Sequence, residues 1–367
     1  MNRVILITTN IAPYRLKWCE ELSKYFDVTI YYSKEKEKNY NDKFLKNSSS
    51  RCHLIKMNNR NDNGEDPLCF DVIKIVKENR KALIIFDGYG PKTNLLGLIY
   101  SKIVGKETYV NIDGYPTERR KNKIRDLIRR FVISNLCDNF FCGGENVKDY
   151  LIGYGANKDK ICVHNFSSIS NEQILKKPLT QEEKIRIREK LGINDKGLIV
   201  LGVGRFVPLK RFEDLILAVE NCKTICSLYL LGGKPTKKYL ELIGSNQNIH
   251  FIDFVLPEEV DDYYRMANLF VLPSETDVWG LVINEAMSKG LPVISSDSPV
   301  AANNLIKDNG FIYKTYNKDE LSRYIDKCLE TKNNENMSIK SLEMIRDYTI
   351  EGIVERQLPI INKYFKL

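Results

Sequence analysis

The sequence predicts an α/β protein of two doubly wound domains, each built on a mostly parallel sheet. Short apolar runs alternate with segments of helical periodicity, which is the pattern of strand–helix–strand units. The alternation forms two similar series that join around residues 167–196, and 367 residues are sufficient for two domains. Two such domains facing each other would leave a cleft at the carboxyl ends of their strands, where ligands bind in these folds.

The first series begins with the buried strand VILITT, which ends before Pro13. The next segment places Leu16, Cys19, Leu22 and Phe26 at helical spacing on one face. The predicted strands are 4–9, 28–33, 82–87 and 107–113, and the predicted helices are 15–26, 71–80 and 93–104. Residues 34–66 are polar and poor in apolar signal, so we expect a surface excursion there.

The second series follows a charged helix at 182–192. Its predicted strands are 197–204, 227–233, 249–254, 269–274 and the LPVISS segment, and its predicted helices are 212–222, 236–243 and 257–267. A further helix should run from Gly280 to Lys289, with Gly290 as its end signal. The two series are alike in architecture, without a visible sequence repeat.

The net charge of +8 lies entirely in the first half of the chain. Residues 1–170 carry a net +9 and the remainder −1, which points to an anionic partner for the first half. Residues 116–136 hold seven Lys and Arg, with apolar residues at helical spacing: Ile124, Leu127, Ile128, Phe131 and Leu136. Such a helix could lie on an anionic membrane surface, or pack on its own sheet with a solvated charged face. Nucleic acid is disfavoured because no stacking aromatics interrupt the basic run.

The nine cysteines and the N-terminus both indicate a cytoplasmic protein. The cysteines form no framework of close pairs, and Cys222 and Cys226 are too few for a metal motif. The first apolar run is too short for a signal peptide, and no segment reaches the roughly 18 apolar residues of a membrane-spanning helix.

Two cations follow the first strand of the second series, in the segment GVGRFVPLKRFEDLI. Val207 occupies the third glycine position of a dinucleotide fingerprint, so that interpretation fails. Arg205 and Lys210 remain, and two cations in a strand-to-helix loop suit a diphosphate, although they could also be solvated surface residues. Gly232 and Gly233 could let the backbone approach a ligand or simply make a tight turn.

The segment TDVWGLVINEA combines a helix start with two carboxylates. The first N–H groups of the helix lack partners and, with the helix dipole, make a seat for an anion. Asp277 precedes this helix and Glu285 lies more than a turn inside it. They could bind a ligand, or Asp277 could cap the helix and Glu285 could be a surface residue.

The segments GRFVPLK and LFVLPSETDVWGLVINEAMSKGLPVI resemble the nucleotide-sugar half of glycosyltransferase family 4, the large retaining GT-B family. The segment ENVKDYLIGYGANKDKICV extends the resemblance more weakly into the first half. The resemblance implies two Rossmann-like domains: an acceptor-binding domain at 1–168 and a nucleotide-sugar domain at 169–349. The final helix, about 350–367, would pack back on the first domain.

The resemblance also implies roles for individual residues. Arg205 and Lys210 would hold the donor diphosphate, Glu285 the ribose, and Asp277 the donor sugar. The remaining donor-side candidates are the backbones of Trp279, Gly280 and Leu281, the glycines Gly204, Gly232 and Gly233, and, near the base, Phe254 and Val255. On the acceptor side the candidates are Ala12, Pro13, Arg15 and His164.

Two positions depart from the family pattern. Many members have Glu where this chain has Asp277, and the shorter side chain could shift the contact to the sugar. Many members also have a His on the fourth strand of the first domain, where this chain has Asp113. Asp113 is therefore a candidate catalytic residue without a role copied from the histidine; His164 could substitute for the histidine or be structural.

The expected function is retaining transfer of a sugar from a nucleotide donor, most simply a UDP-sugar, without a cofactor or metal. The acceptor would be a glycan or lipid-linked glycan in cell-surface polysaccharide or glycoconjugate synthesis. We expect a cytoplasmic protein, peripheral on the inner membrane face through Arg119, Arg120, Lys121, Lys123, Arg129 and Arg130, and no nucleic-acid partner. The alternatives are a sugar-nucleotide epimerase of the same fold and a non-catalytic nucleotide-sugar-binding subunit.

Overall fold

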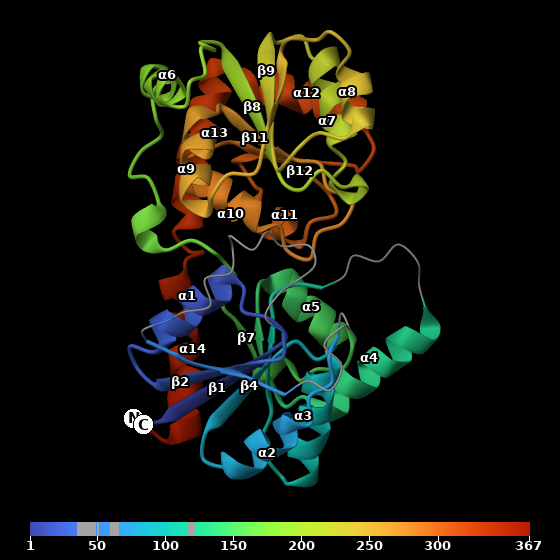
Figure 1. The fold of residues 1–367 in the computed structure, drawn as a ribbon, viewed down its shortest axis with the longest axis vertical. Helices are drawn as coiled ribbons and strands as arrows, with labels where there is room; N and C mark the ends of the chain where they lie inside the picture. The colour runs from blue at the N-terminus through green and yellow to red at the C-terminus, as the bar shows by residue number, and fades with distance from the viewer. Residues whose placement is uncertain (35–48, 50, 59–65, 116–121) are drawn as a thin grey trace. The chain divides into compact units, whose positions relative to one another are not determined.

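The chain folds into two compact units (Figure 1). The computed structural model describes residues 1–34, 49, 51–58, 66–115 and 122–367. Of these, the first unit holds Met1–Tyr115, 122–167 and Thr349–Leu367, and the second holds Ser168–Tyr348. The predicted domain limits at 168 and 349 lie beside these divisions. Which ligand each unit binds stays a prediction.

The first unit is built on a parallel sheet of seven strands among the described residues, in the order β3-β2-β1-β4-β5-β6-β7. The strands are β1 Arg3–Thr8, β2 Asp27–Tyr32, β3 His53–Lys56, β4 Leu83–Asp87, β5 Tyr109–Ile112, β6 Asn139–Cys142 and β7 Ile161–Val163. The order reverses between β1 and β4. This is the topological switch point, where the loops at the carboxyl ends of the strands diverge and leave room for a ligand.

The helices of the first unit are α1 Pro13–Leu22, α2 Asp71–Glu78, α3 Lys92–Ile103, α4 Lys123–Leu136, α5 Glu145–Gly153 and α14 Ile350–Phe365. The last of them packs against α1 (Figure 1). The buried Trp18 indole of α1 donates to Gln357 Oε1 of α14 at 2.9 Å. The final helix therefore belongs to the first unit, next to the first helix of the chain.

The second unit repeats this plan with a parallel sheet of six strands among the described residues, in the order β10-β9-β8-β11-β12-β13. The strands are β8 Leu198–Val203, β9 Cys226–Leu231, β10 Ile249–Ile252, β11 Leu269–Leu272, β12 Val293–Ser296 and β13 Gly310–Tyr313. The helices are α6 Gln181–Lys190, α7 Phe212–Asn221, α8 Lys237–Ile243, α9 Pro257–Met266, α10 Leu281–Ser288, α11 Val300–Leu305, α12 Lys318–Leu329 and α13 Thr331–Ile345. Its switch point lies between β8 and β11.

The sequence explains why the central strands form. A parallel strand covered by helices on both faces is apolar throughout rather than alternating, and β1 and β8 are buried along almost their whole length. Side-chain caps fix several helix starts. Thr180 and Glu183 form a capping box at α6, and Thr349 accepts a hydrogen bond from the backbone of Gly352 at α14.

The predicted alternation of strands and helices is confirmed, with one error among the strands. Residues 34–66 were expected to be a surface excursion, yet His53–Lys56 form β3 and pair in parallel with β2. This strand is short, lies at the edge of the sheet and is mostly exposed, so its residues lack the apolar run by which the other strands are recognised. Strands β6, β7 and β13 were not predicted individually.

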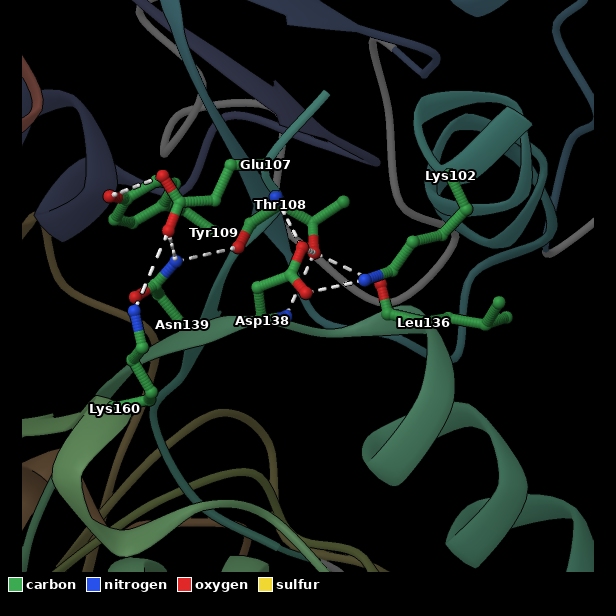
Figure 2. Close-up of polar contacts among 8 residues, drawn as sticks. All are labelled: Lys102, Glu107, Thr108, Tyr109, Leu136, Asp138, Asn139 and Lys160. Atoms are coloured by element: carbon green, nitrogen blue, oxygen red, sulfur yellow. Dashed lines mark hydrogen bonds and ion pairs between the residues drawn. The ribbon is translucent and has the colours of Figure 1, made fainter. Parts of the chain in front are cut away.

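A polar network joins the amino ends of β5 and β6 (Figure 2). The Asp138 carboxylate accepts hydrogen bonds from the Thr108 backbone at 3.0 Å and the Thr108 hydroxyl at 2.9 Å, and it pairs with Lys102 of α3. Partial burial would raise the pKa of Asp138, but Lys102 and Thr108 outweigh burial and hold it below its usual range. A cavity of about 530 Å³ lies beside this network. It is at the amino ends of the strands, whereas the loops of the switch point follow their carboxyl ends.

Candidate functional site

An ion pair spans the switch point of the second sheet. Lys210 follows β8 in a short 3-10 helix, and Asp277 follows β11. Lys210 Nζ lies 2.6 Å from Asp277 Oδ2, and each side chain is only about one-fifth exposed. The Glu275 N–H also donates to the Leu209 carbonyl at 2.8 Å, so the loops after the two strands are tied together. Arg205 lies in the same loop as Lys210 and is exposed.

Glycine at 232 lets the loop after β9 touch the loop after β8. A Cβ atom at Gly232 would lie 1.8 Å from the carbonyl oxygen of Gly204, so any other residue would force the two loops apart. Gly233 follows at the same edge. Phe254 and Val255 lie half-buried beyond the end of β10, so four neighbouring strands contribute predicted donor residues to one edge of the sheet.

Helix α10 begins at this same edge. Gly280 precedes it with φ +104°, a left-handed conformation that favours glycine, and Leu281 is its first residue. The Trp279 indole is buried and donates to Asn284 Oδ1 at 3.0 Å, so the tryptophan ring anchors the helix start inside the unit. Any contribution of Trp279 to a ligand would therefore come from its backbone.

Glu285 is held by two hydroxyl groups. The Tyr264 hydroxyl donates to Glu285 Oε2 at 2.7 Å, and the Ser168 hydroxyl donates to Oε1 at 3.4 Å. Burial raises the pKa of Tyr264 and the Glu285 carboxylate raises it further, so Tyr264 stays protonated as a donor. Glu285 is half-buried with a fixed carboxylate, which disfavours the interpretation of a solvated surface residue.

A second charged cluster spans the switch point of the first sheet. Arg15 of α1 pairs with Asp87 at 2.8 Å, at the end of β4, and with Asp113 beyond β5. Asn111 donates to both carboxylates, at 3.2 Å to Asp87 and 2.8 Å to Asp113. The Thr8 hydroxyl donates to Asp87 at 2.9 Å. One arginine therefore holds two carboxylates, and the cluster carries a net charge of about −1 when both are ionised.

Burial and charge shift the pKa values in this cluster in opposite ways. Burial alone would lower the pKa of the Arg15 guanidinium, but Asp113 and then Asp87 raise it, so Arg15 remains a cation. Burial raises the pKa of Asp113; Arg15 opposes that shift, Asp87 adds to it, and the net result is a raised pKa. Asp113 thus accepts a proton more readily than an ordinary aspartate does.

His164 is buried beside this cluster, 6.3 Å from the Phe166 ring between centroids. Burial, and then the positive charge of Arg15, lower the pKa of His164 to about 3, so the imidazole is neutral. Within the described part of the chain neither ring nitrogen has a hydrogen-bond partner. Ala12 and Pro13 lie at the start of α1, where the Ala12 carbonyl accepts from Leu16 N–H at 3.0 Å. They shape the loop that positions Arg15.

Helix α4 exposes most of its apolar residues. The side chains of Ile124, Leu127, Ile128 and Phe131 are each more than half exposed, whereas Val132 and Ile133 are buried. The interpretation of a helix whose apolar face packs on its own sheet is therefore wrong for the first part of α4. Burial of its apolar residues begins only at Val132 and Ile133, in the second half of the helix.

The basic residues expected at a membrane surface differ in how exposed their side chains are. Lys123 and Arg130 are exposed on α4. Arg129 lies 3.5 Å from Asp126 with its side chain only 14% exposed, so it serves an internal ion pair. Arg119, Arg120 and Lys121 lie outside the described residues. In the described residues no helix is long and apolar enough to cross a bilayer, and no group of three His, Cys, Asp or Glu side chains could hold a metal ion.

Comparison with known proteins identifies the second unit. Residues 183–344 match the family model for glycosyl transferases group 1. These residues form a group 1 glycosyl transferase domain. The match includes β8, α10 and the Lys210–Asp277 pair, so the sheet edge described above is the ligand-facing edge expected of this domain.

Two curated relatives match part of the chain. An alpha-galactosylglucosyldiacylglycerol synthase of Streptococcus pneumoniae is 29% identical over 184 residues, covering 47% of this chain and 48% of that protein. An alpha-monoglucosyldiacylglycerol synthase of the same organism is 25% identical over 230 residues, covering 61% of this chain and 51% of that protein. The chain thus spans about half the length of these curated relatives.

Solved structures match the whole chain at low identity. The structure of Anabaena Alr3699/HepE in complex with UDP aligns with a TM-score of 0.77 and 16% identity, covering 99% of this chain and 100% of that chain. A sucrose-phosphate synthase from Thermosynechococcus elongatus aligns with a TM-score of 0.78 and 16% identity, covering both chains fully. The chain has the GT-B fold, as predicted.

Several partners of the predicted site residues were missed from the sequence of this GT-B protein, among them Tyr264, Ser168, Asp87 and Asn111. Tyr264 lies in α9, where its spacing is that of a core residue. Asp87 ends β4 and was taken as the last strand residue only. A signal that could have indicated Asp87 is its position at the carboxyl end of a strand next to the switch point, whereas Asp113 was singled out through the family resemblance.

The Arg15 cluster generates the first prediction. Replacing Arg15 by Met should lower the free energy of unfolding of the first unit by about 3–5 kcal/mol at pH 7, because two buried carboxylates lose their cation. The loss should shrink toward pH 5, since without Arg15 the carboxyl pKa values rise and protonation removes the cost of the buried charges. Urea unfolding followed by Trp18 fluorescence in a Trp279→Phe background measures both effects.

The control for this prediction is Arg15→Lys, which keeps a cation at the site and should lose less stability than Arg15→Met. An unfolding free energy that is unchanged in Arg15→Met, or a loss of equal size at pH 7 and pH 5, would contradict the electrostatic role of Arg15.

Proposed function

We propose that this protein is a retaining glycosyltransferase that moves a sugar from a UDP-sugar to a glycan or lipid-linked acceptor in cell-surface glycoconjugate synthesis. One observation carries the proposal. Within the group 1 domain, Lys210, Asp277, the start of α10 and Glu285 gather at one edge of a parallel sheet, at its switch point. A cation and a helix N-terminus suit the diphosphate of a nucleotide sugar, and a fixed carboxylate suits the hydroxyl groups of its ribose.

The donor would compete with Asp277 for Lys210. A diphosphate brings more negative charge than one carboxylate, so it attracts Lys210 Nζ away from Asp277 or shares it. Asp277 would then be released to accept a hydrogen bond from a sugar hydroxyl. Arg205, exposed in the same loop, adds a second cation for the phosphates. Glu285, oriented by Tyr264, would bind the ribose hydroxyls as a double acceptor.

The transfer step follows from this arrangement. The acceptor hydroxyl oxygen bonds to the anomeric carbon on the face from which the diphosphate leaves, and the bond from that carbon to the phosphate oxygen breaks. The hydroxyl proton passes to the departing diphosphate. Lys210, Arg205 and the N–H groups at the start of α10 stabilise the negative charge that grows on the leaving group. These groups supply the stabilisation from the protein itself, so we propose that the reaction needs no metal.

The choice of UDP and of the acceptor rests on relatives. The HepE structures are complexes with UDP and with UDP-glucose, and at 16% identity they share the fold of this chain. The curated relatives are named as glycosyldiacylglycerol synthases, which supports a lipid-linked acceptor. The exposed apolar residues of α4, flanked by Lys123 and Arg130, support docking on an anionic membrane.

To test this function, the protein is incubated with UDP-, GDP- and ADP-sugars. Each donor is tried with and without glycolipid acceptors embedded in anionic membranes. Transfer to a glycolipid from a UDP-sugar, with retained configuration by NMR, is the expected result. Formation of an epimer without acceptor would instead indicate a sugar-nucleotide epimerase. A rise in melting temperature with nucleotide sugars but no turnover would indicate a non-catalytic binding subunit, an outcome consistent with the engagement of Lys210 by Asp277.

Replacing Lys210 by Ala should lower kcat by about 10²–10³-fold, because one fixed donor to the developing charge of the leaving group is lost. The exposed Lys332 of α13 provides a matched control, and Lys332→Ala should keep normal kcat. Initial rates at saturating UDP-sugar make the comparison. Near-normal kcat in the Lys210 variant would remove Lys210 from the mechanism.

Replacing Ile124, Leu127, Ile128 and Phe131 together by Ser should weaken binding to anionic vesicles at least tenfold, because the exposed apolar area of α4 no longer enters the headgroup region. Vesicle sedimentation with and without anionic lipid measures the change. Ile225→Ser in the second unit, which removes a side chain that is 89% exposed, is the control and should bind normally. Unchanged sedimentation of the fourfold variant would exclude α4 as the membrane contact.

A further inference from the structure

Two neighbouring strands of the first sheet end in the same tripeptide, Asp-Gly-Tyr. It occupies 87–89 at the end of β4 and 113–115 after β5. These strands pair in parallel, with Asp87 opposite Asn111, and the Gly88 N–H donates to the Asn111 carbonyl at 2.9 Å. The two aspartates meet at Arg15, as described above. The two tyrosines do not join this ion-pair cluster; instead, both contact Tyr150 of α5.

Tyr150 joins these tyrosines by two different contacts. The Tyr89 and Tyr150 hydroxyls lie 2.8 Å apart in a hydrogen bond. The Tyr115 ring stacks on the Tyr150 ring with centroids 4.6 Å apart and planes inclined by 4°. Tyr154, the residue directly after α5, has its ring centroid 4.9 Å from that of Tyr150. We call these four residues the tyrosine cluster.

The tyrosine cluster differs from an ordinary aromatic core. All four side chains remain partly exposed, whereas a purely structural cluster gains most when it is fully buried. Tyr89 and Tyr115 also follow directly on the carboxyl ends of β4 and β5, which is the edge where ligands bind in doubly wound sheets. The cluster is therefore placed as a ligand contact, close in sequence to Asp87 and Asp113.

The chemistry of the tyrosine cluster suits a pyranose ring. One face of a pyranose presents C–H groups that pack on the negative face of an aromatic ring, and its rim presents hydroxyl groups. The Tyr89–Tyr150 hydrogen bond uses only one of the two phenolic hydrogens, so the other hydrogen can be donated to a ligand. The cluster thus offers ring surface and a polar rim together.

The tyrosine cluster is also joined to the helix with the exposed apolar residues. The Tyr154 hydroxyl donates to Asp126 of α4 at 2.8 Å. On α4, Ile124, Leu127, Ile128 and Phe131 are exposed. A molecule with a sugar headgroup and a lipid tail would match the polar, aromatic surface and the neighbouring apolar surface at the same time.

We propose that the tyrosine cluster binds a pyranose already present on the acceptor. This inference rests on the proposed function and narrows it. The acceptor is a glycolipid that carries at least one sugar, rather than a lipid without sugar. The sugar stacks on the ring of Tyr115 and receives a hydrogen bond from the Tyr89–Tyr150 pair, and the lipid lies toward α4.

The test measures sugar binding without any donor, by saturation-transfer NMR with methyl glycosides of glucose, galactose, mannose and N-acetylglucosamine. At least one glycoside should bind the wild type. Tyr115→Leu should weaken that binding about tenfold, because the stacking surface is lost. Tyr115→Phe keeps the ring and should stay within about twofold. Tyr25→Leu, at a tyrosine of the first unit that is 47% exposed and outside the cluster, should bind like the wild type.

Tyr89→Phe is the second variant, in case Tyr115→Leu lowers the melting temperature. It removes one hydroxyl of the pair and should weaken the same glycoside severalfold without removing ring surface. Absence of binding by every glycoside, or equal binding by the wild type, Tyr115→Leu and Tyr89→Phe, would overturn the inference. A Tyr115→Leu variant that loses vesicle binding but keeps glycoside binding would also overturn it, in favour of an aromatic contact with the membrane.

Failure of the proposed function can be told apart from failure of the sugar site. If glycosides bind through Tyr115 but no nucleotide sugar raises the melting temperature or is consumed, the sugar site stands and glycosyl transfer is wrong. If transfer occurs and Tyr115→Leu binds glycosides normally, transfer stands and the sugar site is wrong.

Discussion

A cation held by a carboxylate across the switch point is the interaction on which both sites depend. In the first unit Arg15 reaches Asp87 from the segment after β1, and in the second Lys210 reaches Asp277 from the segment after β8. The reversal of strand order separates the loops at these places, and in each unit an ion pair bridges the two segments. The two units share this plan without visible sequence repetition, but they differ in the number of carboxylates that each cation holds.

The net charges of the two ion-pair clusters differ, and each suits a different kind of ligand. In the second unit one lysine meets one carboxylate at a partly exposed position, so an anionic ligand can take the place of Asp277 with little reorganisation. In the first unit one buried arginine already holds two carboxylates, with Asn111 fixing both. That cluster has no charge to offer an anion. Each of its four carboxylate oxygens already accepts a hydrogen bond or ion pair, so only their further lone pairs are left as acceptors for hydroxyl groups. The charges thus favour a phosphate in the second unit and a polyol in the first.

Much of the fold could be predicted because parallel strands covered on both faces must be apolar throughout, and the runs in β1, β4, β8 and β11 show this. Strand β3 could not, since an exposed edge strand needs no such run. Among the candidate site residues, Glu285 and Lys210 were singled out from their sequence segments, and their roles stay predictions drawn from a family resemblance. Tyr264 could not be found, because its role is to orient Glu285 through a hydroxyl that no spacing rule distinguishes from that of a core tyrosine.

The position of α14 has a consequence for how the chain folds. Trp18 and Gln357 are hydrogen-bonded although 339 residues separate them, so the first unit cannot complete its core until almost the whole chain is available. The second unit, Ser168–Tyr348, is continuous in sequence and needs no such wait. During synthesis the order of completion is therefore the reverse of the order of translation, and α1 keeps an exposed apolar face until α14 closes it.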